Sequence, residues 1–184
     1  FGKTLGFLES NQKDVHDLLI KYTDACFLYL RKQVQSGADV IQIFDSWANL
    51  LTKEDLIEFS FNYINSLISA LKLDPITKNI PVIIFARNPK CNIEELINTS
   101  ADCISLFWSM NDLNFEVAKN KVAIQGNLDP KILLESDETI KRETYKILER
   151  FKEYPGYIFN LGHGITPDIS PDKIKYLTNI VREY

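Results

Sequence analysis

The sequence predicts a parallel α/β protein, in which short strands alternate with helices along the chain. Short apolar runs recur and show little polar alternation, as expected of strands that are covered on both faces. The stretches between them carry apolar residues at three- and four-residue spacing, which is the period of an amphipathic helix. With 184 residues, 45% of them hydrophobic and 25% charged, the chain has the composition of a globular protein that buries a core.

The first predicted elements are a long helix, a strand and a second helix. Residues 12–36 carry the helical apolar spacing, and Gly37 ends that helix. The run DVIQIF, residues 39–44, is typical of a short buried strand. Thr52 is a good helix cap, so we expect the next helix to begin there and to stop before Pro75.

The same alternation continues to the C-terminus. Further strands are expected at 81–86, 103–108, 121–126 and 157–162. Helical segments are expected at 91–100, at 112–120, from 129–130 onward, at 137–151 and from 170–171 onward. Pro130 and Pro171 suit first helical positions, because the N–H that proline lacks would have no helical partner there.

Two parallel architectures fit this pattern, an open doubly wound sheet and a (β/α)8 TIM barrel. The first predicted element is a helix with no strand before it. On the barrel interpretation, residues 1–184 form a single domain holding about five C-terminal βα units, and the N-terminal part of the barrel is missing. An incomplete barrel would leave the edge of its sheet uncovered.

Charge and cysteine content exclude several classes of partner. A net charge of −4 gives no basic field for nucleic acid or an anionic membrane. No apolar run approaches the ~18 residues of a membrane span. The three cysteines, Cys26, Cys91 and Cys103, form no CxxC pair, which favours a reducing compartment and argues against a cysteine-based metal site.

Candidate ligand contacts follow the predicted strands, because the carboxyl ends of parallel strands form the functional edge. These segments are 45–49, 87–92, 109–112, 127–130 and 163–164. Among them, Ser46, Arg87 and His163 carry groups that can bind an anion. Gly162 and Gly164 flank the histidine, and glycine allows a backbone to approach its neighbours closely. Neither a glycine-rich phosphate loop nor an HExxH motif is present.

Four segments together closely resemble the C-terminal half of uroporphyrinogen decarboxylases: SGADVIQIFDSWAN, PVIIFARN, VAIQGNLDP and FNLGHGITPDISPDKI. The resemblance covers nearly the whole chain. It implies a TIM barrel of roughly twice this length. It also implies a cytoplasmic lyase of porphyrin and heme biosynthesis, usually a homodimer. Such a decarboxylase removes carbon dioxide from the four acetate side chains of uroporphyrinogen III, giving coproporphyrinogen III without a metal or organic cofactor.

The resemblance assigns substrate binding to particular residues. The family's substrate-binding serine matches Ser46, a phenylalanine two positions earlier matches Phe44, and the histidine of the NLGHG segment matches His163. Arg87 is a further candidate, since a guanidinium can clamp a carboxylate. The family's main catalytic arginine and aspartate are expected upstream of this chain, so no catalytic residue is assigned within it. A structural alternative stays open for His163, as a strand-end residue bonded to neighbouring backbone.

Two other functions remain as alternatives. One is a non-catalytic truncated fragment that pairs with a missing half. The other is a zinc-dependent methyltransferase of the same superfold, whose relatives carry a His-x-Cys pair where this chain has Phe85 and Arg87. Phenylalanine and arginine are not zinc ligands, which weighs against this second alternative.

Overall fold

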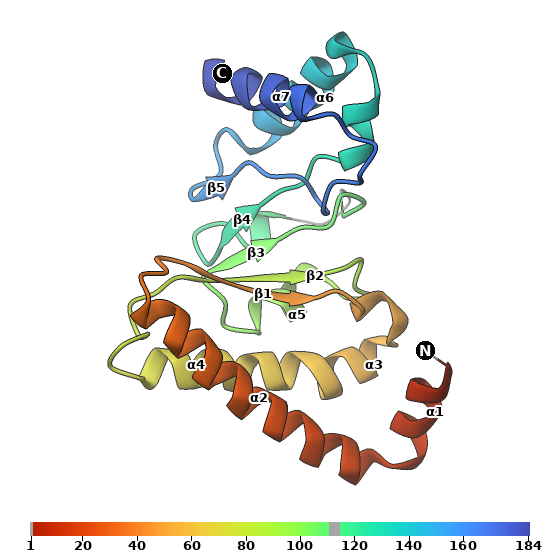
Figure 1. The fold of residues 1–184 in the computed structure, drawn as a ribbon, viewed down its shortest axis with the longest axis vertical. Coiled ribbons are helices and arrows are strands. Elements are labelled where there is room, and N and C mark those ends of the chain that lie inside the picture. Colours follow the sequence, from red (N-terminus) through yellow and green to blue (C-terminus); the bar gives the residue numbers. More distant parts are fainter. Residues whose placement is uncertain (1, 111–114) are drawn as a thin grey trace.

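The computed structural model describes residues 2–110 and 115–184, and these form one five-stranded parallel sheet with helices around it (Figure 1). The strands are β1 Ile41–Asp45, β2 Val82–Ala86, β3 Cys103–Ser105, β4 Ala123–Gln125 and β5 Tyr157–Ile158. All neighbouring pairs are parallel. Helices α2 and α4 lie on the side of β1 and β2 in Figure 1, whereas α6 and α7 lie at the opposite end, beyond β5. The predicted α/β class is therefore confirmed.

The order of the strands tests the doubly wound alternative for the described part of the chain. It runs β1-β2-β3-β4-β5 without a reversal. A doubly wound sheet needs a point where the order reverses, so that alternative is wrong for these strands. Since nearly all parallel crossovers are right-handed, an unreversed order puts the connecting segments on one face of the sheet. A segment of a barrel has the same strand order, but β1 and β5 are the two edges of this sheet and do not pair with each other, so the described strands form an open sheet.

The register of the strands lines up an apolar row of residues and, next to it, a row that mixes apolar and polar residues. One row across the sheet is entirely apolar apart from a tyrosine hydroxyl: Ile43, Ile84, Ile104, Ile124 and Tyr157. The next row toward the carboxyl edge contains Phe44, Phe85, Ser105, Gln125 and Ile158. In this second row the amide of Gln125 donates to the Ser105 hydroxyl at 3.0 Å, which satisfies polar groups that are buried.

The N-terminal half contains the longest helices. Helix α2, Gln12–Gln35, ends where Gly37 adopts a φ of +102°, so the predicted helix is confirmed. The predicted helix from Thr52 is also present, but in three continuous pieces, α3 Lys53–Leu56, the π-helical turn η2 Ile57–Phe61 and α4 Asn62–Leu73. The Thr52 hydroxyl caps it by accepting from the Asp55 N–H. Two short elements were not predicted, α1 Gly2–Ser10 and the 3-10 helix η1 Ala48–Leu50.

The C-terminal half begins with short elements. These are α5 Ile93–Ile97 and two 3-10 helices, η3 Phe115–Val117 and η4 Pro130–Leu134. Asp129 caps η4 by accepting from the Lys131 N–H at 2.9 Å, which explains the Asp-Pro start. The helix expected over 112–120 falls partly on 111–114, which lie outside the described residues.

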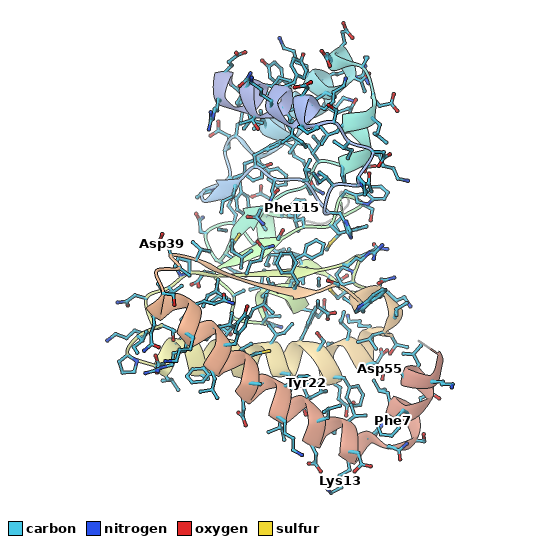
Figure 2. All side chains as sticks on the ribbon, viewed as in Figure 1. Phe7, Lys13, Tyr22, Asp39, Asp55 and Phe115 are labelled. Atoms are coloured by element: carbon cyan, nitrogen blue, oxygen red, sulfur yellow. The ribbon has the colours of Figure 1, made fainter. Side chains whose placement is uncertain are left out.

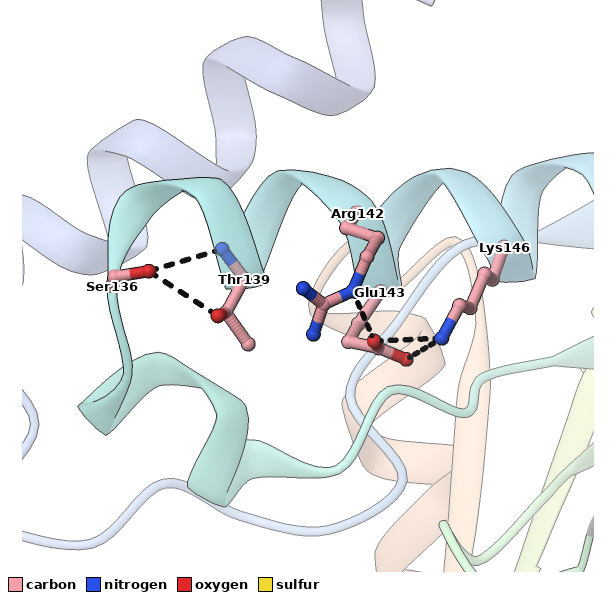
Figure 3. A network of polar contacts seen from close by, with 5 residues as sticks. All are labelled: Ser136, Thr139, Arg142, Glu143 and Lys146. Carbon is pink, nitrogen blue, oxygen red and sulfur yellow. Dashed lines mark hydrogen bonds and ion pairs between the residues drawn. The ribbon is translucent and has the colours of Figure 1, made fainter.

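Two amphipathic helices, α6 Asp137–Phe151 and α7 Pro171–Glu183, complete the fold. Ser136 caps α6 by accepting from the Thr139 N–H at 3.3 Å, as Figure 3 shows. On the exposed side of the same helix, Lys146 and Arg142 bond the Glu143 carboxylate and lower its pKa, against the opposing effect of burial. Within the described part of the chain, no helix has both the length and the apolar character needed to cross a membrane.

The buried start of β2 depends on one carboxylate, that of Asp102. Its Oδ2 accepts from the Val82 N–H and from the Lys72 ammonium, each at 2.7 Å. Asp102→Ala should lower the free energy of unfolding by about 1–3 kcal/mol, because the Val82 N–H loses its acceptor next to a fully buried side chain. Lys72→Met, which removes the partly exposed ion pair and a hydrogen bond to the Ile80 carbonyl but leaves the Val82 N–H its acceptor, should cost less, about 1 kcal/mol. Urea unfolding measures both, and equal losses would contradict this account.

Candidate functional site

The carboxyl edge of the sheet brings together residues that are far apart in the sequence. Ser46 follows β1, Arg87 follows β2 and His163 lies beyond β5. The pairing of β4 with β5 extends toward this edge, because Leu128 and Leu161 form a further parallel bridge. The predicted contacts therefore lie at the same end of the sheet. Their role in binding stays a prediction.

Only one of the two glycines beside His163 is needed for the approach of the backbone. A Cβ atom on Gly162 would lie 2.4 Å from the backbone nitrogen of Trp108 and 2.5 Å from its Cα. Any side chain there would force apart the segment that follows β3 and the segment that follows β5. A Cβ on Gly164 would meet nothing within 4 Å. Gly162 therefore lets the end of β5 pack against the segment after β3, and this contact carries His163 into the centre of the edge.

A row of aromatic rings joins the two sides of this edge. The Phe44 and Phe85 rings have centroids 5.9 Å apart, and Phe85 lies 6.2 Å from the His163 ring. On the other side, His163 lies 5.9 Å from Phe107, whose ring is 5.4 Å from that of Trp108. Phe44 and His163, two of the predicted site residues, thus pack against the same intervening ring.

Ser46 lines a cavity of about 550 Å³ at the end of β1, between α1, α2 and η2. The cavity is mostly apolar, and its lining includes Phe44, Asp45, Trp47 and Tyr63. Asp45 is fixed there, since its carboxylate accepts from the Ser60 hydroxyl at 2.5 Å and from the Trp47 N–H at 3.3 Å. Neither Arg87 nor His163 lines this cavity. Of the predicted residues, the cavity brings together Ser46 and Phe44, and Phe44 connects it to the aromatic row.

Arg87 offers a positive charge at the same edge. Its backbone N–H donates to the Asp45 carbonyl at 2.9 Å, which anchors the residue to β1 while its side chain is half-buried. In the ranges 2–110 and 115–184, no carboxylate forms an ion pair with this guanidinium. A half-buried arginine of this kind can bind an incoming carboxylate with two parallel hydrogen bonds.

The cysteines are poor candidates for zinc ligands. Burial raises the pKa of Cys91 and that of Cys103 to about 12, and the neighbouring Glu95 and Asp102 carboxylates act in the same direction. Both thiols are therefore protonated at neutral pH, whereas zinc binds the thiolate. Among the residues that the structure describes, no three His, Cys, Asp or Glu side chains gather as a metal-binding group.

Sequence reasoning missed the contribution of Phe107 and the reason for Gly162. Phe107 belongs to an apolar strand run, so its residue type predicts only core packing. The Gly162 contact with Trp108 joins segments 54 positions apart (162 − 108), and no local pattern reports it. The GHG sequence itself was the one available signal for a close approach at this point.

Taken together, these features define a class: a parallel α/β protein with a strand-edge site suited to an anionic ligand that has apolar surface. The family model described as Uroporphyrinogen decarboxylase (URO-D) matches residues 1–184. The chain therefore belongs to the uroporphyrinogen decarboxylase family.

Individual relatives agree with this assignment. The uroporphyrinogen decarboxylase of Vesicomyosocius okutanii is 38% identical over 186 residues, covering 100% of this chain and 53% of the relative. The enzyme of Chlorobaculum parvum is 41% identical over 177 residues, covering 91% of this chain and 48% of the relative. That of Aquifex aeolicus is 38% identical over 184 residues, with shares of 100% and 53%. The chain thus spans about half the length of the curated relatives it matches.

A solved structure supports the fold alone. The methyltransferase from Methanosarcina mazei superposes with a TM-score of 0.68 and 21% sequence identity, covering 94% of this chain and 53% of that one. At this identity, only the arrangement of strands and helices carries over.

Proposed function

We propose that this chain forms the substrate-binding wall of a uroporphyrinogen decarboxylase. The observation that carries the proposal is that Ser46, Arg87 and His163 lie at the same end of a parallel sheet, where a row of aromatic rings joins Phe44 to His163. Uroporphyrinogen combines many carboxylates with an apolar tetrapyrrole body. A site for it needs several separate donors around an aromatic or apolar surface, and the described edge offers both.

The proposed reaction is cofactor-independent because the substrate provides its own electron sink. An acid protonates a pyrrole carbon, which makes the ring electron-poor. The bond between the acetate methylene and its carboxylate then breaks, carbon dioxide leaves, and the electron pair returns to the ring. A proton adds to the methylene carbon and the ring proton is lost, so each acetate becomes a methyl group. In this scheme Arg87 and Ser46 hold carboxylates in place and His163 contacts the tetrapyrrole body, and the acid and the ring-stabilising carboxylate come from the other half of the family's length.

We further propose that the sheet is part of a (β/α)8 barrel in a single domain, completed by that other half. Exposed apolar groups on the described part of the chain support this proposal. On α2 the stripe of Leu18, Tyr22 and Tyr29 includes two tyrosines that are 61% and 67% exposed, and Tyr22 is labelled in Figure 2. Both edge strands also expose apolar residues, Phe44 on β1 and Ile158 on β5. Unpaired strand edges and apolar stripes of this kind favour a covering partner. Cytoplasmic location and a homodimeric state belong to the same proposal.

An assay with uroporphyrinogen III tests this function. A polypeptide of full family length that carries this chain should convert uroporphyrinogen to coproporphyrinogen without added metal and in the presence of a chelator. Chromatography of the oxidised porphyrins measures the loss of the four acetates. Product that forms only when zinc is supplied, or no product with a folded full-length protein, would refute the proposal.

The 184-residue chain by itself tests whether this part of the family's length is catalytic alone. We expect no turnover from this chain, because the proposed acid lies outside it. Adding the polypeptide that carries the other half should restore turnover, and Tyr22→Glu should weaken the pairing by placing a charge within the exposed stripe of α2. Glu9→Gln, an exposed change on α1, is the control. Turnover by the isolated chain would contradict the assignment of the acid to the other half.

A further inference from the structure

The imidazole of His163 packs edge-to-face against two phenylalanine rings from different strands. Phe85, on β2, has its ring centroid 6.2 Å from that of the imidazole, at an interplanar angle of 73°. Phe107, which follows β3, lies 5.9 Å away at 86°. Both phenylalanines are only 7% exposed. Their rings are fixed by the core, so they restrict how the imidazole between them can turn.

One ring nitrogen of His163 already faces an acceptor. Nδ1 lies 3.3 Å from the carbonyl oxygen of Gly164. Because a carbonyl oxygen can only accept, this hydrogen bond requires that Nδ1 carry the hydrogen. Nε2 of the neutral ring then carries a lone pair and can accept a hydrogen bond from a ligand.

We propose that Phe85 and Phe107 are positioning residues, which hold the His163 ring against the Gly164 carbonyl so that Nε2 faces the ligand. Only the identity of that ligand, a tetrapyrrole whose pyrrole N–H groups can donate to the Nε2 lone pair, rests on the proposed function. Removal of either phenyl ring gives the imidazole room to rotate. Both tautomers then become populated, and a part of the population no longer presents Nε2.

Histidine NMR tests the positioning directly, because the chain contains two histidines in different surroundings. His16, on α2, stacks on Phe59 at a centroid distance of 5.0 Å and bonds the Tyr63 hydroxyl at 2.6 Å. We would label the protein with 15N-histidine, assign the signals with His163→Gln, and compare Phe85→Leu and Phe107→Leu with Phe59→Leu. The three phenylalanines are similarly buried, so Phe59→Leu is a matched control.

We expect His163 in the unaltered protein to show the nitrogen shifts of the Nδ1–H tautomer. In Phe85→Leu and Phe107→Leu its signals should move toward the values of a tautomer mixture, while those of His16 stay in place and report that the fold is intact. In Phe59→Leu only the His16 signals should move. An Nε2–H tautomer in the unaltered protein, or unchanged His163 signals in both variants, would overturn the proposal.

Steady-state kinetics on the full-length polypeptide test the consequence for the ligand. Phe85→Leu and Phe107→Leu should raise KM about threefold to tenfold with a much smaller change in kcat. Phe61→Leu, a buried change outside the aromatic row, should leave KM unaltered. An unchanged KM together with shifted His163 signals would overturn the positioning role. If the unaltered protein has no decarboxylase activity, the proposed function fails while the NMR result still decides the role of the two rings.

Discussion

Gly162→Ala is expected to destabilise this protein more than any other single methyl addition at a glycine. The new Cβ would lie 2.4 Å from the backbone nitrogen of Trp108 and 2.7 Å from its Cβ. These neighbours are main-chain atoms and the Cβ atom of Trp108. They cannot rotate away as the end of a flexible side chain would. We expect a loss of about 3 kcal/mol or more in the free energy of unfolding, at the upper end of overpacking costs. Urea unfolding followed by circular dichroism measures it.

Gly164→Ala is the matched control, one residue beyond the histidine. Its Cβ would have no neighbour within 4 Å, so we expect a change below about 1 kcal/mol. The NMR signals of His163 should also differ between the two variants, because only Gly162→Ala displaces the segment that follows β5. Similar losses for both variants would show that the packing against Trp108 is not what fixes this segment.

Arg87→Met is expected to have the second large effect, on substrate binding and not on stability. The guanidinium has no carboxylate partner in the described parts of the chain, so its removal leaves no buried acid of residues 2–110 and 115–184 uncompensated. Stability should change by less than about 0.5 kcal/mol. A hydrogen bond to a charged group contributes about 1.5–3 kcal/mol, so kcat/KM of the full-length polypeptide for uroporphyrinogen should fall by about tenfold to a hundredfold.

Arg142→Met provides the comparison for this second experiment. Arg142 lies on the exposed side of α6, where it pairs with Glu143 as drawn in Figure 3. Its removal should leave kcat/KM unchanged and cost less than about 1 kcal/mol. If Arg87→Met instead destabilised the protein by more than about 1 kcal/mol and left the kinetics intact, Arg87 would be a structural residue.

Much of the fold could be predicted because its signals are local. The helix caps Thr52 and Ser170 and the Asp129 cap before Pro130 act within a few residues, and the structure contains all three. The π-helical turn at 57–61 could not be predicted, since its residues continue the helical apolar spacing of their neighbours. Strands β3 and β5 are shorter than their apolar runs, because a run reports burial whereas a strand also needs a hydrogen-bonding partner in register.

The candidate site divides in the same way. Ser46 and His163 were found through short motifs, which are local by nature. The order of the strands, which eliminated the doubly wound alternative, arises from pairings between distant segments. The same holds for the packing of Phe107 on His163, which depends on where β5 ends relative to β3. Side-chain type alone gives no information on such contacts.

The placement of the two tryptophans gives the protein a built-in optical signal. Trp47 lines the Ser46 cavity, and the Trp108 ring lies tilted against Phe107 at the other end of the aromatic row. The fluorescence of indole depends on its contact with solvent. The emission wavelength or intensity of each tryptophan should therefore change when a ligand binds next to it. A ligand titration can therefore be followed by intrinsic fluorescence. Comparing Trp47→Phe with Trp108→Phe, each of which leaves one tryptophan, would show which end of the aromatic row binds ligand first.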